Sequence, residues 1–600
     1  MRETTSPSLI DVDPAMSIPG LLAARLERAP DGVFIERKTH LGGGWTPVTT
    51  RSFHDHVTAV ARGMVARGVA PGDRVSIMSR TRYEWTVLDF AIWAAGAVPV
   101  PVYETSSAEQ IVWILSDADV RLALVESTAH AAATASVRDR LPGLEAVLVI
   151  DDGALETLVA DGARVEDAEV ERRSALAGMA DLATIIYTSG TTGNPKGVEL
   201  THGNFVSLTL EGVQGLADVV AKPYSRTLLF MPLAHVFARF IQVLCVPSGA
   251  VIGHTPDTAN LLADLGTFKP TFILAVPRVF EKVYNSSEQK AAASPVKLKL
   301  FRWAAGTGIA WSRAMDRPGG PSPALRARHA LADRLVLHKI RAALGGATEY
   351  AVSGGAPLGE RLGHFYRGLG LRVLEGYGLT ETTAPTAVNL PEKTKIGTVG
   401  PPFPGTSVRI ADDGEIEVSG AHVFRGYRGD PQATAEALRD GWFRTGDLGT
   451  LDTDGMLTIT GRKKEIIVTA GGKNVAPAFL EDRLRGHPLV SQVVVVGDGK
   501  PFIAALVTLD ADMLPGWLAG HGLPPMDVAA ASRSHAVLAA LDRAVERANT
   551  AVSRAESIRK VHVLTVDFSE ANGYLTPSQK VKRSAVLRDF APQVEALYER

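Results

Sequence analysis

A stretch rich in hydroxyl groups and glycines, "YTSGTTGNPKG" at residues 187–197, holds side chains well suited to chemistry. Its key positions are Thr188, Ser189, Gly190, Thr191, Thr192, Gly193 and Lys196. Glycines let backbone N–H groups approach an anion closely, hydroxyls add hydrogen-bond donors, and a lysine adds positive charge. The stretch therefore favours a phosphate-binding loop. From these residues alone, a surface loop without a ligand is the alternative.

Two widespread phosphate-binding loops do not fit this stretch. A Walker loop follows the pattern G-x-x-x-x-G-K-[ST]. Counting from Gly190 places Pro195 at the second glycine and Gly197 at the magnesium-binding hydroxyl. A protein-kinase loop requires G-x-G-x-x-G together with HRD and DFG elements, which this sequence lacks. A different phosphate chemistry is indicated.

Six further motifs follow the loop along the chain. They are "MPLAHVF" (231–237), "SGGAP" (353–357), "GYGLTET" (376–382), "FRTGDLG" (443–449), "GRKKEIIVTAGGKNVAP" (461–477) and "LTPSQKVKR" (575–583). With the loop, they resemble the ordered signatures of the AMP-forming adenylating enzymes, which include acyl-CoA synthetases, peptide-synthetase adenylation domains and luciferases. The resemblance spans roughly residues 30–590.

Within that family, the chain looks like the long-chain fatty acid–CoA ligases. Short-chain and aryl members more typically end in "PKTxSGK", whereas Gln579 stands before Lys580 here. A long basic helical segment at 281–345 and the stretch "RAALGGATEYAVSGGAPL" support the same branch. A content rich in alanine, arginine and glycine resembles actinobacterial proteins.

The resemblance implies a reaction in two half-reactions. A fatty carboxylate attacks the α-phosphorus of MgATP, and the thiol of coenzyme A then attacks the resulting acyl-adenylate and releases AMP. The expected partners are ATP, a long-chain fatty acid and CoA, with Mg²⁺ as cofactor. One alternative is a fatty acyl-AMP ligase that serves a carrier protein, but no extra segment follows "GRKKEIIVTAGG". A non-catalytic scaffold, the alternative of another class, would not need these motifs intact.

The resemblance also assigns roles in ATP binding. The hydroxyls and glycines of residues 188–193, with Lys196, would surround the β- and γ-phosphates. The other expected ATP contacts are Gly354, Gly355, Ala356, Glu375, Gly376, Tyr377, Gly378, Thr380, Asp447, Arg462 and Lys580. Among these, Tyr377 would offer a flat face to adenine, and Asp447 would accept both ribose hydroxyls with Arg462 beside it.

Five residues are expected to act in catalysis: Lys580, Glu381, Thr380, His235 and Lys196. Glu381 and Thr188 would hold Mg²⁺, which needs few protein ligands beside substrate oxygens. Thr380 would donate to the α-phosphate. Lys580 would stabilise the charge that develops as the carboxylate attacks.

Coenzyme A is expected to meet a different set of residues: His235, Gly471, Gly472 and Lys473. His235 would lie where the acyl and CoA channels join, and the two glycines would leave room for a thin pantetheine arm. Because Lys580 and CoA need the same space, the C-terminal domain would rotate between the half-reactions. Lys464 is the expected hinge.

Alternating strand-like and helix-like runs must position these residues. The runs at 73–79, 83–97, 98–103, 108–118 and 121–126 predict parallel α/β layers. Alternation around a "DDG" turn at 405–420 predicts an antiparallel hairpin. We expect a large N-terminal adenylation domain over 1–462, with α/β subdomains, a β-rich subdomain and a helical insert at 281–345, and a small mobile α+β domain over 463–600.

Composition bears on the possible partners of the protein and on its location. The net charge of −2 over 600 residues gives no electrostatic footprint for nucleic acid. The single cysteine, Cys245, excludes an intrachain disulfide and fits a reducing cytoplasm. No apolar run reaches the ~18–20 residues that span a bilayer. We expect a cytoplasmic protein, and the basic insert leaves peripheral contact with the inner face of the membrane open. Monomer and homodimer are both compatible with the sequence.

Overall fold

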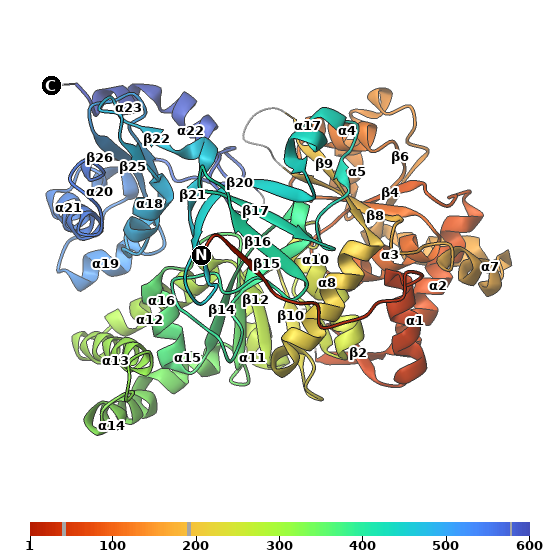
Figure 1. The fold of residues 1–600 in the computed structure, drawn as a ribbon, viewed down its shortest axis with the longest axis horizontal. Coiled ribbons are helices and arrows are strands. Elements are labelled where there is room, and N and C mark those ends of the chain that lie inside the picture. Colours follow the sequence, from red (N-terminus) through yellow and green to blue (C-terminus); the bar gives the residue numbers. More distant parts are fainter. Residues whose placement is uncertain (39–43, 189–193, 577–578, 600) are drawn as a thin grey trace.

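The computed structural model describes residues 1–38, 44–188, 194–576 and 579–599. It is a mixed α/β molecule in which a large N-terminal part carries a smaller C-terminal part at one side (Figure 1). The predicted fold class is confirmed by this arrangement. Among the described residues, no helix combines the length and apolar character needed to cross a bilayer.

The first sheet is parallel and has the strand order β5-β4-β6-β7. Its strands are β4 (Arg74–Met78), β5 (Val98–Val102), β6 (Val120–Val125) and β7 (Ala146–Val149), and its first connections are α3 (Tyr83–Ala94), α4 (Ala108–Asp117) and α5 (Thr128–Ala135). The strands are short apolar runs, and β4, β5 and β6 are almost wholly buried, as parallel strands between helices are, whereas the edge strand β7 is partly buried. The predicted alternation of strands and helices is confirmed here.

The central sheet has eight strands in the order β15-β14-β13-β12-β10-β11-β2-β3. The strands are β2 (Val33–Lys38), β3 (Trp45–Thr49), β10 (Arg226–Leu229), β11 (Val251–His254), β12 (Phe272–Ala275), β13 (Tyr350–Ser353), β14 (Arg372–Leu379) and β15 (Ala384–Val388). The strands from β14 to β2 run parallel, and an antiparallel strand closes each edge. The motifs at 231–237, 353–357 and 376–382 therefore meet at the carboxyl ends of parallel strands, where ligands bind in open α/β sheets.

Helices pack around these two sheets. They are α1 (Ile18–Arg28), α2 (Thr50–Ala66), α6 (Ala154–Asp161), α7 (Asp167–Ser174), α8 (His202–Gly215), α9 (Ala217–Val220), α10 (Val236–Ser248), α11 (Leu261–Phe268) and α16 (Glu360–Leu369). One continuous apolar core joins them to the strands.

Two antiparallel sheets complete the large domain. One has the order β1-β16-β17-β20-β19, with β21 added to β20, and the other has the order β18-β9-β8. Their strands are β1 (Glu3–Thr5), β8 (Leu182–Thr188), β9 (Lys196–Thr201), β16 (Thr406–Ile410), β17 (Glu415–Gly420), β18 (Gly426–Tyr427), β19 (Leu438–Arg439), β20 (Trp442–Leu451) and β21 (Leu457–Arg462), and α17 (Pro431–Ala437) follows β18. The predicted hairpin over 405–420 is confirmed by β16 and β17, in which Val408 faces Val418.

The expected helical insert is present but starts earlier than predicted. It comprises α12 (Pro277–Ala292), α13 (Pro295–Met315), α14 (Pro323–Ala332), a π-helical turn (Asp333–Leu337) and α15 (His338–Ala343). The predicted break at 316–323 is confirmed. The start moves to Pro277 because proline is favoured in the first turn of a helix. Helix α13 packs closely on α16, where a Cβ on Gly368 would lie 2.3 Å from the carbonyl oxygen of Gly308.

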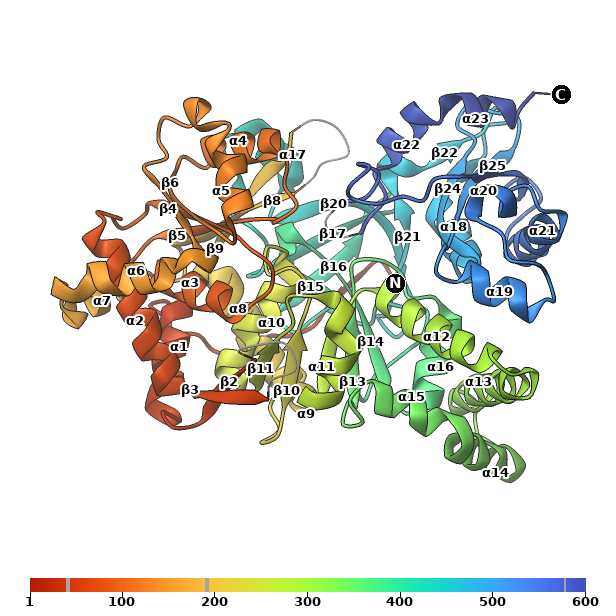
Figure 2. The same ribbon diagram turned by 180° about the vertical axis from the view of Figure 1, so that it is seen from behind.

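The C-terminal part forms its own three-stranded sheet, with the order β24-β25-β26. Its elements are β22 (Ile467–Val468), β23 (Asn474–Val475), α18 (Pro477–Arg485), β24 (Val490–Val496), β25 (Ile503–Leu509), α19 (Leu514–Gly520), α20 (Val528–Ala531), α21 (His535–Asn549), β26 (Ile558–Leu564), α22 (Arg583–Asp589) and α23 (Ala591–Ala596). Strand β22 is short and follows a 3₁₀ turn formed by Lys463–Glu465. Seen from behind, this part lies against α12 and α13 (Figure 2).

A buried ion pair joins three of these layers. Arg239 on α10 donates to both carboxylate oxygens of Asp89 on α3, at 2.9 and 2.5 Å, and both side chains are fully buried. Arg239 also donates to the Thr184 hydroxyl on β8 at 2.6 Å. Its guanidinium lies 4.9 Å from the ring centroid of Trp93. The pair thus fixes α10 against both α3 and β8.

Replacing Arg239 with methionine should lower the free energy of unfolding of the large domain by about 3–5 kcal/mol, because Asp89 is left buried without a positively charged partner and keeps only the hydrogen bond from Gln242. The double variant Arg239→Met/Asp89→Leu should recover most of that loss. The first transition in urea unfolding measures both. The exposed pair Arg140–Glu109 is the matched control, and Arg140→Ala should leave the free energy of unfolding close to that of the wild type. A single variant as stable as the control would contradict this role.

Candidate active site

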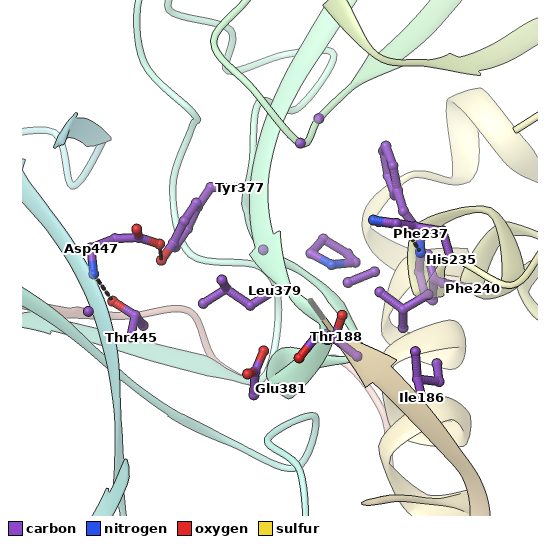
Figure 3. A pocket seen from close by; sticks show the side chains of 18 of the residues that line it. Ile186, Thr188, His235, Phe237, Phe240, Tyr377, Leu379, Glu381, Thr445 and Asp447 are labelled. Atoms are coloured by element: carbon purple, nitrogen blue, oxygen red, sulfur yellow. Dashed lines mark hydrogen bonds between the residues drawn. The ribbon is translucent and has the colours of Figure 1, made fainter. Parts of the chain in front are cut away.

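A cavity of about 860 Å³ opens between the large and the small domain. Its wall contains residues from β8, β14, β20 and α10, together with Lys580 of the small domain. Figure 3 shows Tyr377, Thr445 and Asp447 at one end, His235, Phe237 and Phe240 at the other, and Glu381 and Thr188 between them. The cavity therefore has a polar end and an apolar end.

The polar end is organised around Asp447. Asp447 and Arg462 are cross-strand partners on β20 and β21, and the Arg462 Nε lies 2.9 Å from a carboxylate oxygen of Asp447. The hydroxyl of Tyr377 donates to the other oxygen at 2.7 Å. Burial and the Asp447 carboxylate raise the pKa of Tyr377 well above its usual value, so the phenol keeps its proton. The three residues predicted for adenosine binding are brought together.

Two glycines in this region are required by geometry. A Cβ on Gly378 would lie 1.5 Å from the carbonyl oxygen of Ala384 on the neighbouring strand, and a Cβ on Gly354 would lie 3.1 Å from the ring of Phe237. Thr383 and Ala384, with φ of 58° and 118°, adopt backbone conformations rare for such residues. The "GYGLTET" motif thus forms a tight, strained turn that holds Thr380 and Glu381 at the cavity.

Glu381 lies in the middle of the cavity wall and accepts a hydrogen bond from the Tyr427 hydroxyl at 2.9 Å. Burial raises the pKa of Glu381 above its usual value, and a bound cation would favour its ionised form. Among the residues that the structure covers, no group of three His, Cys, Asp or Glu side chains is placed to hold a metal. One carboxylate with the Thr188 hydroxyl nearby fits Mg²⁺ that takes most of its ligands from a nucleotide and water.

The predicted phosphate loop connects β8 and β9. Thr188 and Lys196 are the last facing pair of this hairpin, and both line the cavity. The Lys196 Nζ lies 3.6 Å from Asp430 and 4.8 Å from the ring centroid of Tyr427. Ser189, Gly190, Thr191, Thr192 and Gly193 lie outside the described residues.

His235 caps the N-terminus of α10, where its Nδ1 accepts a hydrogen bond from the N–H of Phe237 at 3.2 Å. Burial, and secondarily the charge of Lys580, lower the pKa of His235 to about 4, so it is neutral near pH 7. Beyond it, apolar residues from 231–245 and from β12 line the deep end of the cavity. They include Phe237, Phe240, Ile241, Leu244 and Phe272.

Lys580 belongs to the small domain and lines the cavity, and its side chain is exposed to solvent. The protein atoms around it, and next the charge of Arg462, lower the pKa of Lys580 below its usual value. The preceding Gln579 has φ of 62°, a left-handed conformation that favours glycine. This is the position at which Gln579 departs from the glycine of the short-chain and aryl enzymes.

Several predicted residues do not line the cavity. Ala356 is exposed, and Glu375 turns away to accept a hydrogen bond from the N–H of Leu358 at 2.9 Å. Burial raises the pKa of Glu375 to about 7. Gly471, Gly472 and Lys473 lie on an exposed turn of the small domain, where the Lys473 Nζ is 3.4 Å from Glu556. Their assignments stay predictions.

The other predicted residues line the cavity: Thr188, Lys196, His235, Gly354, Gly355, Gly376, Tyr377, Gly378, Thr380, Glu381, Asp447, Arg462, Lys464 and Lys580. Tyr427, which orients Glu381, was missed. Its only local signal is an aromatic residue within "FRGYRGD" (424–430), and nothing in that stretch indicates a contact with residue 381.

Comparisons with known proteins identify the family of the chain. A profile described as AMP-binding enzyme matches residues 22–428, and one described as AMP-binding enzyme C-terminal domain matches residues 464–600. The chain therefore belongs to the AMP-binding enzyme family.

Relatives that match most or all of the chain indicate which branch of the family it belongs to. The chain is 50% identical over 604 residues to long-chain-fatty-acid–CoA ligase FadD15 of Mycobacterium bovis, with 100% of both chains covered. It is 32% identical over 556 residues to human long-chain-fatty-acid–CoA ligase 6, covering 87% of this chain and 78% of the human one. The predicted long-chain fatty acid–CoA ligase branch is confirmed.

Solved structures show the same fold. Anthranilate CoA ligase AuaEII with anthranoyl-AMP matches with a TM-score of 0.74 at 20% identity, covering 98% of this chain and 99% of that one. A fatty acyl CoA synthetase of Mycobacterium tuberculosis matches with a TM-score of 0.62 at 23% identity, covering 97% and 100%.

The lowered pKa of Lys580 predicts an alkaline limit to activity. If charged Lys580 is the active form, kcat/KM for ATP in adenylate formation should fall as pH rises through a pKa below the 10.5 of an ordinary lysine. In Lys580→Arg the guanidinium stays charged, so this fall should move to higher pH. Adenylate formation measured from pH 7 to 10.5 tests this, and identical profiles for the two enzymes would contradict it.

Proposed function

We propose that this protein activates long-chain fatty acids with ATP, through an acyl-adenylate, to acyl-CoA, and releases AMP and pyrophosphate. One observation carries the proposal. A single cavity joins an apolar wall on α10 to the groups suited to adenosine, phosphate and a developing negative charge. An acyl chain and a nucleotide can therefore meet within it.

In adenylate formation, the polar end would hold adenosine through Tyr377 and Asp447. The apolar wall would hold the acyl chain, so that its carboxylate points toward the α-phosphate. Lys580 would donate to the carboxylate and the α-phosphate as negative charge builds up between them. Its positive charge favours that state over the separated reactants, which lowers the barrier.

Pyrophosphate leaves from the side of Thr188 and Lys196. These two groups would act on the leaving phosphates and not on the part transferred. Mg²⁺ held by Glu381 and Thr188 would supply further positive charge to the phosphates. His235, being neutral, would shape the junction between the acyl wall and the CoA entrance without transferring a proton.

The second half-reaction would require the small domain to move. Lys580 lines the cavity between the domains, whereas the predicted CoA residues Gly471 and Gly472 are exposed and do not line it. Lys464, on the 3₁₀ turn after β21, would be the hinge. We favour CoA over a carrier protein as acyl acceptor because no extra segment separates that turn from α18.

Separated half-reactions test the proposal. Lys580→Ala should slow adenylate formation by on the order of 10²–10³-fold, and thioester formation from supplied acyl-adenylate should change less than about twofold, because that step leaves Lys580 outside the cavity. Lys464→Pro should slow thioester formation and leave adenylate formation nearly unchanged. Lys464→Ala is the control, because alanine removes the side chain without restricting the backbone at residue 464.

A panel of fatty acids with ATP, with and without CoA, supplies the substrate readout. AMP release and mass spectrometry of the product should show a long-chain acyl-CoA. An adenylate that persists when CoA is added would favour the carrier-protein alternative. Selective use of acetate or an amino acid would overturn the long-chain assignment.

We also propose that the helical insert contacts an anionic membrane surface. Residues 281–345 contain twelve Lys or Arg and four Asp or Glu, a net charge of +8 in a chain of net charge −2. The four acidic residues already lie within 4 Å of an arginine: Glu281, Glu288, Asp316 and Asp333. Exposed apolar side chains, among them Val296, Met315, Leu331 and Leu335, lie along the same helices. Basic helices with exposed apolar groups suit a negatively charged lipid surface.

Vesicle sedimentation measures this contact. Binding to phosphatidylglycerol vesicles should exceed binding to phosphatidylcholine vesicles. The fourfold variant Arg326→Gln/Arg328→Gln/Arg334→Gln/Lys339→Gln should weaken it by up to about 10³-fold, because each basic residue near the surface contributes about 1 kcal/mol. A control with equal loss of charge in the small domain, Arg543→Gln/Arg547→Gln/Arg554→Gln/Arg559→Gln, should bind as the wild type does. Equal losses in both variants would refute the assignment.

A further inference from the structure

Helix α4 contacts both ends of the phosphate loop. The loop leaves β8 after Thr188 and enters β9 at Lys196, and these two residues face one another across the hairpin. Trp113 and Asp117 of α4 are four residues apart, so they lie one turn apart on the same side of the helix. Each makes a hydrogen bond to a different end of the loop.

Trp113 holds the end that leads into β9. Its indole N–H donates to the carbonyl oxygen of Pro195 at 2.8 Å. The indole is 36% exposed, which is unusual for so large an apolar side chain. Burial in an apolar core therefore does not explain why a tryptophan occupies residue 113. The hydrogen bond fixes the backbone directly before Lys196.

Asp117 holds the end that leaves β8. It accepts a hydrogen bond from the Tyr187 hydroxyl at 2.5 Å. Burial, and next the Asp117 carboxylate, raise the pKa of Tyr187 far above its usual value, so the phenol remains a donor. A Cβ on Gly197, which faces Tyr187 across the hairpin, would lie 3.1 Å from the tyrosine ring. The absence of a side chain at residue 197 gives the phenol room to cross toward α4.

The C-terminus of α4 is fixed in turn to the strand that orients Glu381. Arg428 donates to the carbonyl oxygens of Asp117 at 2.7 Å and Ala118 at 3.4 Å, as cations do at helix C-termini. The neighbouring Tyr427 pairs with β9 and donates to Glu381. One helix is therefore connected to Thr188, Lys196 and Glu381.

We infer that α4 is the support of the ATP phosphate site and that Trp113 and Asp117 are positioning residues for Thr188 and Lys196. Neither side chain needs to touch ATP. They fix the spacing and direction of the two loop ends, so that the groups meeting the β- and γ-phosphates are ordered before the nucleotide binds. Such order lowers the entropy lost on binding. This inference rests on the proposed use of ATP, but not on the identity of the acid that is activated.

The inference predicts that variants of these two residues bind ATP more weakly and bind the fatty acid as the wild type does. In Trp113→Phe, which keeps an aromatic ring but loses the N–H donor, the Kd for ATP without fatty acid should rise about fivefold. In Asp117→Ala it should rise about tenfold, because a bond to a charged group is lost. KM for ATP should rise by similar factors. KM for the fatty acid, and thioester formation from supplied acyl-adenylate, should change less than about twofold. Calorimetry and separated half-reaction assays give these values.

Two further variants separate positioning from stability. Asp117→Asn keeps an oxygen that can accept the Tyr187 hydroxyl, so it should restore most of the ATP affinity. In a Tyr187→Phe background, Asp117→Ala should add little, because the two changes remove one interaction. Glu109→Gln is the matched control on the same helix, since Glu109 pairs with the exposed Arg140. It should leave ATP affinity unchanged.

The outcomes are distinguishable. ATP affinity within twofold of wild type in both Trp113→Phe and Asp117→Ala would overturn the inference. So would an equal fall in both half-reactions, which indicates general destabilisation. If the wild type binds ATP through this support but forms no acyl-CoA from any long-chain acid, the proposed function fails and the inference stands.

Discussion

The charge of Arg239 is the constraint around which the cavity is organised. A buried guanidinium needs a negatively charged partner and hydrogen-bond acceptors, and here Asp89 and Thr184 supply them from α3 and β8. Because Arg239 follows His235 by one turn of α10, this pairing also sets the N-terminus of that helix and the apolar wall beyond it. Since β8 leads directly into the phosphate loop, the same interaction relates the wall of the acyl site to the phosphate site.

The small domain brings Lys580 to this framework and contacts the large domain through polar groups. Arg278 donates to Ser491 and to Asp510 at 3.3 Å, and Gln289 donates to the carbonyl oxygen of Asp512 at 3.0 Å. Each domain keeps its own apolar core. Polar interfaces of this kind are compatible with relative domain motion. The structure thus places Lys580 on a domain whose apolar cores are separate from the core of the large domain.

The sequence was sufficient for the features that are local. Short apolar runs predicted the strands β4, β5 and β6, and motif order predicted which residues gather at Asp447 and Glu381. It was not sufficient for contacts between distant segments. The pairing of β1 with β16 joins residues about 400 positions apart, and the bond from Tyr427 to Glu381 depends on how β18 meets β9. A single sequence records each segment's own preferences, whereas such contacts depend on how whole layers pack. Trp113 and Asp117 look like ordinary surface residues of a helix for the same reason.

Gln579 illustrates how one backbone position serves the site. A residue with a side chain at φ of 62° is less stable there than glycine by roughly 1 kcal/mol. Hydrogen bonds around it compensate. The Thr576 N–H donates to the carbonyl oxygen of Lys580, the Gln579 N–H donates to the carbonyl oxygen of Thr576, and the Lys580 N–H donates to the Thr576 hydroxyl. Glycine at residue 579 would allow many more backbone conformations, whereas glutamine restricts them. The left-handed conformation of Gln579 therefore helps to orient Lys580, and its strain is the cost of that restriction.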